Sequence, residues 1–421
     1  MMERIKLFLL NNKGLLQNFG SLSLVQLINF LIPIIILPYI VRILGTYHFG
    51  LVNFALAVNN YFLIIIDYGF NISGVREISF HRDDKEKLSK IFSAIIFVKL
   101  FLFFLTSIIL IILITTIDRF IQFTNLYFAF LIFNLGNALY PIWFYQGLEK
   151  TFSLPLINLF PKLLGIVMIF IFVKSPNDYD LYVLIMGFVN LLIGLIVFLN
   201  SFRIDKIRLV TIKPKELLNT LKSGFTIFLS SLGINIYTNM NVIILGILTD
   251  ENIVGIYAAA DKIRIAIQSF FSQFSQSIFP RVNYLLRSSA NKFLLFNEKL
   301  LRFQSIIMFL ISLIVFFFAE QLVVLLLGND FEQSVLILRI LCWLPFVISI
   351  SNVYAIQILL SLKQDKRFLI LVFSAAMLSI FLTIILTLKY YALGTAIAFL
   401  LTEIFVSYQS YKYYKEIKLK I

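Results

Sequence analysis

Long apolar runs alternate with short polar segments along the whole chain. A run of about 20 apolar residues is long enough to cross a hydrocarbon core of about 30 Å. Such runs must be helices, because lipid cannot satisfy free backbone polar groups, and the period-two alternation of a membrane barrel is missing. The pattern predicts an all-α integral membrane protein with about twelve transmembrane helices. Their approximate limits are residues 18–41, 49–73, 91–116, 122–147, 153–173, 181–202, 223–248, 253–280, 300–319, 333–360, 368–388 and 393–411.

Composition supports this interpretation. The 421 residues are 60% hydrophobic and 14% charged, which lies far outside the range of soluble domains. Residues 1–17 form a short amphipathic lead-in without a small-residue cleavage site, so we do not expect a cleavable signal peptide. The one cysteine, Cys342, lies within a predicted span, so there is no disulfide framework.

The formal net charge of +14 follows from where the basic residues lie. If the N-terminus is cytoplasmic, the cytoplasmic segments hold about 26 of the 36 Lys and Arg residues, chiefly in 74–90, 203–222 and 412–421. Both termini are therefore predicted to be cytoplasmic, and the basic loops to attract anionic membrane lipids. Nucleic-acid binding is not expected, because no basic segment has a folded domain or interleaved aromatic residues.

The short loops and the missing motifs narrow the functional classes. No segment outside the predicted spans exceeds about 20 residues, which excludes a nucleotide-binding or extracytoplasmic catalytic domain. P-loop, GxGxxG, HExxH and paired-cysteine patterns are absent. The two histidines, His48 and His81, are predicted on opposite membrane sides. We therefore expect no metal, no cofactor and no enzymatic activity.

One phrase occurs twice: VRILGTYHFGLVNFALA at 41–57 resembles VIILGILTDENIVGIYAAA at 242–260. Glycine suits helix ends, so two similar turns could arise by chance. Gln146 and Gln357 also correspond, however, each ending an even-numbered span before a charged turn. We therefore predict a duplicated six-helix unit.

Because each unit holds an even number of spans, the repeat is parallel, and two bundles would face a central cavity as in a transporter. The predicted domains are an N-terminal bundle at 1–202, a basic linker at 203–222 and a C-terminal bundle at 223–421.

The residues also carry a family resemblance. Residues 18–79 resemble the start of Wzx-type flippases. These flippases form the polysaccharide transporter branch of the multidrug/oligosaccharidyl-lipid/polysaccharide exporter superfamily. The segment 255–282, GIYAAADKIRIAIQSFFSQFSQSIFPRV, is similar to an eighth-helix segment shared across that superfamily. The informative early positions are Asn29, Pro33, Pro38-Tyr39, Arg42-Ile43-Leu44-Gly45, Phe49-Gly50 and Asp67-Tyr68-Gly69-Phe70.

The resemblance implies a flippase of the bacterial inner membrane that moves undecaprenyl-diphosphate-linked oligosaccharide repeat units for O-antigen or capsule. It also implies polysaccharide polymerase and chain-length machinery as partners. A cation-coupled small-molecule or drug antiporter of the same superfamily is the alternative within transport. An O-antigen polymerase or membrane glycosyltransferase is the alternative from another class, and it would be expected to carry a long extracytoplasmic loop, which this chain lacks.

Ionisable residues inside spans are the leading site candidates, because lipid makes unpaired charge costly. Lys262 and Arg264 lie near mid-depth, roughly 14–17 Å into the eighth predicted span at 1.5 Å per residue. In the lipid II flippases of the superfamily an arginine at the Lys262 position is thought to hold the diphosphate; lysine here binds phosphate as a point charge. The doubled phrase is interpreted as placing Asn59 opposite Lys262. The alternative for Arg264 is neutralisation by Asp261, three residues earlier.

Further candidates are spread over the other spans. Lys99 and Lys162 lie too deep for easy snorkelling and either face the cavity or form interhelical pairs. The candidates for hydrogen bonds to sugars are Asn59, Asn60, Asn29 and Gln26. Asp67 is a candidate for helix capping, loop packing or coupling, Asp261 for coupling or gating, and Glu403 for binding a coupling cation. Pro33 and Pro38 are expected to break the first helix.

Overall fold

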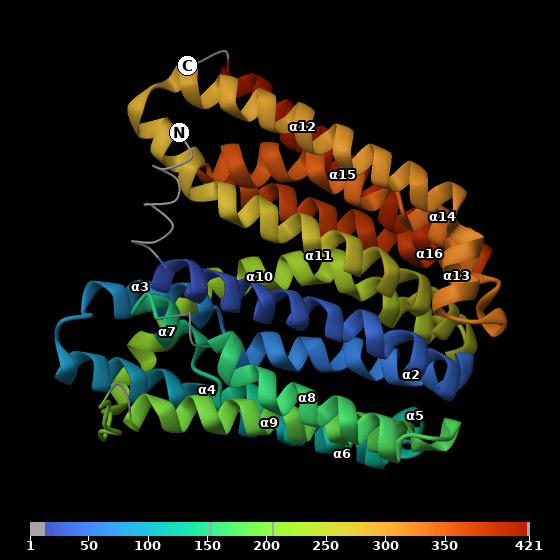
Figure 1. The fold of residues 1–421 in the computed structure, drawn as a ribbon, viewed down its shortest axis with the longest axis horizontal. Coiled ribbons are helices and arrows are strands. Elements are labelled where there is room, and N and C mark those ends of the chain that lie inside the picture. Colours follow the sequence, from blue (N-terminus) through green and yellow to red (C-terminus); the bar gives the residue numbers. More distant parts are fainter. Residues whose placement is uncertain (1–12, 151–153, 204–205, 419–421) are drawn as a thin grey trace. The chain divides into compact units, whose positions relative to one another are not determined.

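The computed structural model describes residues 13–150, 154–203 and 206–418, and within these ranges the side chains of 13–31, 33–34 and several positions between 270 and 290 are left undescribed. This part of the chain contains helices and turns and no strand (Figure 1). In chain order the α-helices are α2 (Lys13–Asp67), α3 (Phe70–Phe80), α4 (Lys85–Thr116), α5 (Asp118–Ile121), α6 (Thr124–Leu139), α7 (Ile142–Gly147), α8 (Leu154–Phe172), α9 (Tyr179–Arg203), α10 (Pro214–Leu248), α11 (Glu251–Ser288), α12 (Ala290–Phe317), α13 (Ala319–Leu326), α14 (Ser334–Leu341), α15 (Leu344–Ser351) and α16 (Asp365–Lys418). Two 3₁₀ turns and one π-helical segment complete the list: η2 (Pro176–Asp178), η3 (Asn329–Phe331) and η4 (Asn352–Leu360).

Nine helical stretches in the described ranges are long and apolar enough to cross a membrane, which confirms the all-helical membrane class. Two of them hold more than one predicted span. Backbone breaks at Gly45 in α2 and at Tyr391 in α16 separate predicted neighbours within these long helices. Helix α11, predicted as the span 253–280, is not among the nine, because charged and amide residues interrupt its apolar sequence.

The break in α2 lies at Gly45, not at the prolines. Gly45 has φ 66° and ψ −179°, a backbone region that is open almost only to glycine. The helix runs through Pro33 and Pro38 without a non-helical residue. The prediction that these prolines break the first helix is therefore wrong.

Two predicted spans are divided into shorter helices. The span predicted at 122–147 ends one helix at Leu139 and begins another at Ile142, on either side of Pro141. Proline has no backbone N–H to continue the ladder. The span predicted at 333–360 comprises α14, α15 and the π-helical η4. Long π-helical segments are rare and are frequently found at functional sites.

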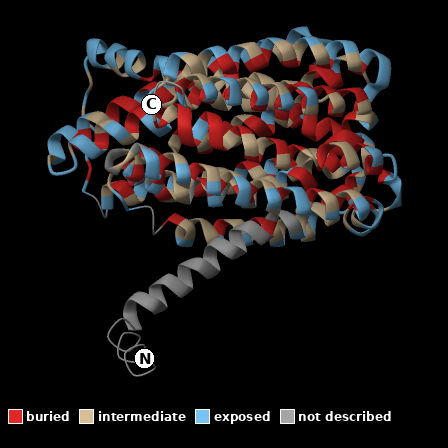
Figure 2. Ribbon diagram, turned by 90° about the horizontal axis from the view of Figure 1, so that it is seen from above, coloured by how far each residue is buried: buried red, intermediate tan, exposed pale blue. Residues whose placement is uncertain are grey.

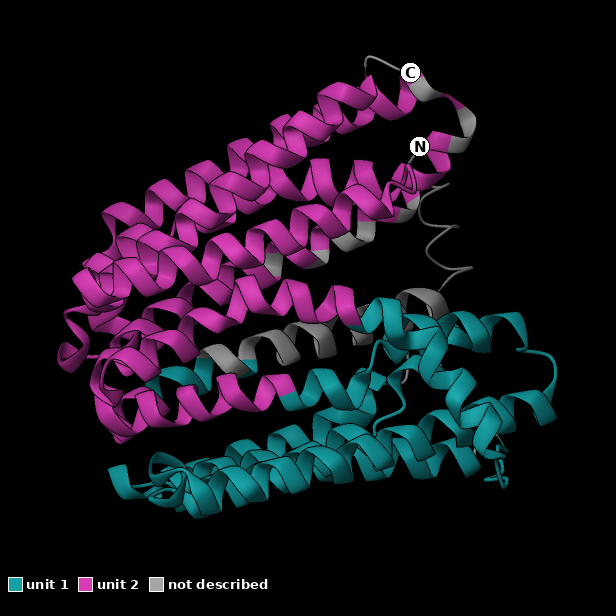
Figure 3. Cartoon of the chain, turned by 180° about the vertical axis from the view of Figure 1, so that it is seen from behind, with its two compact units in different colours: residues 1–39, 62–228 teal, residues 40–61, 229–421 magenta. Residues whose placement is uncertain are grey.

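The chain forms two compact units, residues 1–39 with 62–228 and residues 40–61 with 229–421 (Figure 3). The core of the first unit is aromatic: Phe92 and Trp143 are fully buried, with ring centroids 5.7 Å apart, and Phe198 stacks on Phe92 at 5.9 Å. The buried positions are marked along the helices in Figure 2. The predicted domain limits assign the first copy of the repeated phrase, 41–57, to the N-terminal bundle. These limits stay a prediction.

The basic linker is attached to the first unit by two serines of α4. The backbone N–H of Arg208 donates to Ser89 Oγ at 3.2 Å, and the N–H of Val210 donates to Ser93 Oγ at 3.0 Å. The side chain of Ile207 between them is buried. An extended segment thus follows α4 through hydroxyls spaced one helical turn apart, and it leads directly into α10.

In the second unit the two copies of the doubled phrase pack against each other. A Cβ atom added to Gly50 would overlap the carbonyl oxygen of Glu251 and lie 2.6 Å from the backbone nitrogen of Gly255. A Cβ atom on Gly255 would overlap the carbonyl oxygen of Thr46. Thr46 Oγ1 also donates to Asn252 Oδ1 at 2.8 Å. The repeated glycines are therefore the point at which α2 and α11 cross with direct backbone contact, as small residues allow in membrane helices.

We predict that Gly50→Ala and Gly255→Ala each destabilise the protein by about 1–3 kcal/mol, because the added methyl group meets backbone that cannot move aside. The measurement is the thermal unfolding midpoint of the purified chain in detergent, followed by tryptophan fluorescence. Gly233→Ala is the matched control, since the nearest atom to its added Cβ is Val372 Cγ1 at 2.8 Å, the end of a side chain. Equal midpoints for all three variants would show that the crossing is not tightly packed.

Candidate functional site

Helix α11 carries charges on two different faces. Successive helical residues are rotated by about 100°, so Lys262 and Arg264 project about 200° apart. Arg264 is buried, whereas Lys262 is half-buried. The two cations therefore lie in different surroundings, although they are only two residues apart in sequence.

Arg264 is neutralised within its own helix. Its Nε donates to Asp261 Oδ1 at 2.5 Å, and its guanidinium lies over the Phe399 ring with 5.3 Å between Cζ and the ring centroid. This is the i, i+3 pair that the sequence offered as the alternative. A direct role for Arg264 in binding substrate stays a prediction.

A cavity of about 360 Å³ lies on the Arg264 face, inside the second unit. Helices α10, α11, α15, η4 and α16 supply its walls. Glu403, which has no basic neighbour close to it in its own helix, is buried and lines the same cavity as Arg264. Asp261, Arg264 and Glu403 together carry about one net negative charge when ionised, so this cavity does not favour a diphosphate.

Lys262 lies on the other face of α11. It follows Gly255 by seven residues, which is close to two full turns, so both project from the same side of the helix. That side is the one that contacts α2 at Gly50. Lys262 forms no ion pair with any carboxylate among the residues that the structure describes. A role for Lys262 in binding an anion stays a prediction.

The crossing also sets the register of the two phrases. Gly50 meets Gly255, and both helices continue without interruption past these points. Counting nine residues along each helix brings Asn59 level with Arg264, and counting seven brings Ala57 level with Lys262. The predicted pairing of Asn59 with Lys262 would need a shift of two residues that neither helix contains. Asn59 is buried and Asn60 is half-buried in this part of α2.

Lys99 is the most deeply buried charged side chain of the first unit and is fully engaged. Only 1% of its surface is exposed. Its Nζ donates to Asp67 Oδ1 at 3.0 Å and to the backbone carbonyl of Asn137 at 2.9 Å. Three segments, α2, α4 and α6, are thereby joined. The structure shows the interhelical pair that was one of the two alternatives for Lys99, and it gives Asp67 a partner on α4.

The structure gives less information about the other predicted residues. Lys162 is half-buried on α8 and Pro38 is half-buried on α2. The side chains of Gln26, Asn29 and Pro33 lie outside the described residues. The roles of these five residues in binding or gating stay predictions.

A row of polar residues along α10 was not predicted. Asn235 Nδ2 donates to the carbonyl of Ser231 at 2.9 Å, and Asn239 Nδ2 donates to Asn235 Oδ1 at 2.8 Å. Asn239 then lines the cavity of the second unit. The sequence does contain a pattern that would have predicted this row. Asn235 and Asn239 are four residues apart in an otherwise apolar span, and this spacing places both amides on one helix face.

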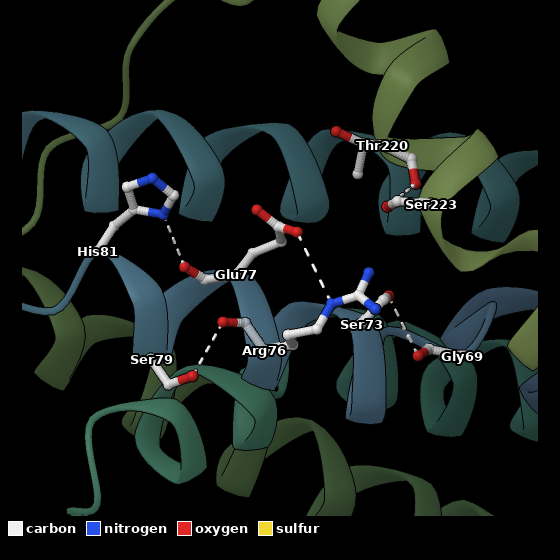
Figure 4. Close-up of polar contacts among 8 residues, drawn as sticks. All are labelled: Gly69, Ser73, Arg76, Glu77, Ser79, His81, Thr220 and Ser223. Atoms are coloured by element: carbon white, nitrogen blue, oxygen red, sulfur yellow. Dashed lines mark hydrogen bonds and ion pairs between the residues drawn. The ribbon is translucent and has the colours of Figure 1, made fainter. Parts of the chain in front are cut away.

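A second cavity, of about 370 Å³, lies inside the first unit between α3, α4 and the start of α10. Its polar lining includes Ser73, Glu77, Thr220 and Ser223 (Figure 4). Both serines and Thr220 donate to backbone carbonyls of their own helices. Glu77 and Glu216 outnumber the single lysine of the wall, so this cavity does not favour an anion either.

These helices and buried charges define a multi-pass membrane protein with polar sites inside an apolar fold. A model of the family described as polysaccharide biosynthesis protein matches residues 15–285, and the chain belongs to this family.

Two relatives cover nearly the whole chain. A protein of Escherichia coli (strain K12) named "Putative O-antigen transporter" is 34% identical over 397 residues, which is 94% of this chain and 96% of that protein. A protein of Shigella dysenteriae with the same name is 29% identical over 404 residues, covering 93% and 97%. These findings confirm the predicted membership of the polysaccharide transporter branch and indicate a transporter, not an enzyme.

Solved structures show the same fold. The lipid II flippase MurJ in an inward closed conformation matches with a TM-score of 0.72 at 16% identity, over 94% of this chain and 87% of that one. An inward-facing multidrug resistance transporter of the MATE family matches with a TM-score of 0.67 at 13% identity, over 91% and 93%. At these identities the likeness concerns the fold alone.

We predict that the Lys99–Asp67 pair stabilises the fold, and that removing Asp67 destabilises the protein more than removing Lys99. Asp67→Ala leaves a nearly inaccessible ammonium without its carboxylate and should cost about 3–5 kcal/mol. Lys99→Met should cost less, because the Asp67 carboxylate it leaves behind is 28% exposed. The measurement is thermal unfolding of each single variant and of the double variant.

The double variant is the control for this prediction. It should lose less stability than the sum of the two single losses, because it leaves neither charge unpaired. Additive losses would show that the two charges do not stabilise each other.

Proposed function

We propose that this protein is a flippase that moves polyprenyl-diphosphate-linked oligosaccharide repeat units across the bacterial inner membrane for O-antigen or capsule synthesis. The family and the two relatives named as O-antigen transporters support this proposal. The expected substrate is the undecaprenyl diphosphate form. Its charged head group needs a cation inside the membrane, and its hydrocarbon tail can remain in lipid.

The single observation that carries the proposal is that Lys262, half-buried on α11, forms no ion pair with the described residues. Buried cations in membrane helices are usually paired, and Lys99 and Arg264 follow this rule. Lys262 does not form such a pair with the described residues, and it lies on the face of α11 that carries the glycine crossing. A lysine ammonium binds phosphate as a point charge. We infer that Lys262 binds the diphosphate.

The proposal includes the architecture predicted from the sequence. Twelve transmembrane helices would form two parallel six-helix bundles around a central cavity, with both termini in the cytoplasm. Exchange between inward and outward openings would then carry the head group across. Asn59, Asn60, Gln26 and Asn29 remain candidates for contacts with sugars. Lys162 remains a candidate for a second contact with phosphate. Polysaccharide polymerase and chain-length machinery are the proposed partners.

A cation-coupled antiporter is the second candidate, and one observation favours it. The cavity of the second unit contains Glu403 and lies beside Asp261, which together exceed the charge of Arg264. A cavity with a net negative charge and aromatic walls fits an organic cation. In the flippase proposal Glu403 remains a candidate for coupling transport to a cation.

We predict that Lys262→Ala lowers translocation of lipid-linked repeat units at least about 10-fold, because a charge-assisted contact contributes about 1.5–3 kcal/mol. Lys262→Arg should retain most of the activity, since it keeps the charge at the same depth. Surface polysaccharide and inner-leaflet lipid-linked repeat units are measured in a null strain that expresses each variant.

Lys366→Ala is the control, because it removes an exposed lysine that lies at the start of α16. Membrane levels of every variant are measured in parallel. Full complementation by Lys262→Ala would exclude Lys262 as the anchor. A null strain with normal polysaccharide and altered drug resistance would favour the antiporter.

A further inference from the structure

Three tyrosines of the second unit surround a small pocket between α12, η4 and α16. The ring centroids of Tyr354 and Tyr414 lie 5.1 Å apart, and those of Tyr354 and Tyr411 lie 5.4 Å apart. Tyr411, Tyr414 and Lys418 follow one another at spacings of three and four residues, which places them on one face of α16. The pocket has a volume of about 230 Å³, and it reaches the surface at Tyr411, which is 44% exposed.

The aromatic walls of this pocket favour an ammonium group. An aromatic ring attracts a cation that lies within about 6 Å of its centroid, and cages of such rings bind ammonium ligands. The chain itself supplies one example, because Nζ of Lys418 lies 5.8 Å from the ring centroid of Tyr414. The same Nζ donates to Glu298 Oε1 at 2.8 Å. Glu298 and Lys418 are the two charged residues of the lining, so the pocket carries no net charge.

A buried amide of α12 adds an unused acceptor to the same pocket. Asn297 is 2% exposed, and its Nδ2 donates to the carbonyl of Phe293 at 2.9 Å, which fixes the orientation of the amide. Its Oδ1 is buried and has no hydrogen-bond partner among the described residues. A buried acceptor without a donor destabilises the fold. Because Asn297 lines the pocket, an N–H group of a ligand bound there would supply the missing donor.

The walls of the pocket are held in place by apolar packing. Tyr354 and Tyr414 are buried and belong to one hydrophobic cluster with Val353 and Ile358. Tyr354 lies on the π-helical η4, and π-helical segments are frequently found at functional sites. Tyrosines that only mark a membrane surface would not need this burial. The site is therefore preorganised, as binding sites require.

The position of the pocket indicates a lipid head group. Lys418 is the last residue of α16, and Asn297 lies in the first turns of α12. Both helices belong to stretches long and apolar enough to cross a membrane, and lipid head groups lie at the ends of such stretches. Pockets for whole small molecules hold roughly 300–1,000 Å³. The smaller volume of this pocket suits a head group whose acyl chains stay outside.

We propose that this pocket binds the head group of a phospholipid that carries a primary amine. The ammonium lies against the tyrosine rings and donates an N–H to Asn297 Oδ1, and Lys418 attracts the phosphate of the same head group. A quaternary ammonium has no N–H for Asn297, and an anionic head group has no charge for the tyrosines. This site is distinct from the proposed transport and does not depend on it.

The test uses the full-length protein in detergent and three lipids with identical acyl chains. Phosphatidylethanolamine has the N–H donors, phosphatidylcholine has an ammonium without them, and phosphatidylglycerol has a phosphate without an amine. Dissociation constants are measured by native mass spectrometry. The wild-type protein should bind phosphatidylethanolamine at least about 10-fold more tightly than either of the others, because only this lipid makes both the charge-assisted hydrogen bond and the contact with the rings.

Variants test the two parts of the site separately. Asn297→Leu removes the acceptor, so it should bind phosphatidylethanolamine and phosphatidylcholine equally. Tyr411→Leu should weaken both amine lipids by about 3- to 10-fold, whereas Tyr411→Phe keeps the ring and should bind like the wild type. Tyr408→Leu is the matched control, because this exposed tyrosine of α16 does not line the pocket. Thermal unfolding midpoints show which variants are folded, and the exposed Tyr411 tests the site even if Asn297→Leu unfolds.

Several outcomes would overturn the proposal. Equal binding of the three lipids to the wild-type protein, or tighter binding of phosphatidylglycerol, would show that no amine is recognised. A preference for phosphatidylethanolamine that persists in Tyr411→Leu and in folded Asn297→Leu would place the amine elsewhere. Glycerophosphoethanolamine, which has the head group without acyl chains, should bind far more weakly than the lipid. Equal affinity for this soluble compound would overturn the assignment to a lipid. Each of these results would leave the flippase proposal standing.

Discussion

The cost of placing charge inside an apolar helical fold is the constraint on which the internal sites depend. Lipid and packed apolar side chains do not solvate an ion, so a charge inside the fold needs a partner. Lys99 has Asp67 and the carbonyl of Asn137, and Arg264 has Asp261. Against this background the half-buried Lys262, without an ion pair in the described residues, is the exception. This exception, and not the presence of charge by itself, is what supports the proposed contact between Lys262 and a diphosphate.

The contact between Gly50 and Gly255 fixes the register of α2 against α11. Direct backbone contact at Gly50 and Gly255 leaves no freedom for the two helices to slide past each other without a clash. Every other position on α2 and α11 can therefore be counted from that point. The count assigns Lys262 to the crossing face and Arg264 to the cavity face. It also explains why two cations only two residues apart have different environments.

Patterns that are local in sequence were predictable, and contacts between distant segments were not. The apolar runs predicted the helices, and the spacing of Asp261 and Arg264 predicted their pairing. Nothing in the sequence indicated that Lys99 would meet Asp67, because the pair depends on how α2 and α4 pack. The break at Gly45 agrees with the predicted spans 18–41 and 49–73, whereas the further break expected at Pro33 and Pro38 leaves no non-helical residue. Likewise, nothing in the sequence indicated that Tyr354 would meet Tyr411 and Tyr414.

The polarity of α11 follows from the same constraint. A helix that only anchors a fold in lipid can be apolar all round, but one that separates two different sites needs polar groups on two faces. The crossing face of α11 carries Lys262, and its cavity face carries Arg264 and Gln268. This division leaves too little apolar sequence for α11 to count among the membrane-length apolar helices. Its weak hydropathy is thus a direct consequence of the polar and charged groups that it carries on both faces.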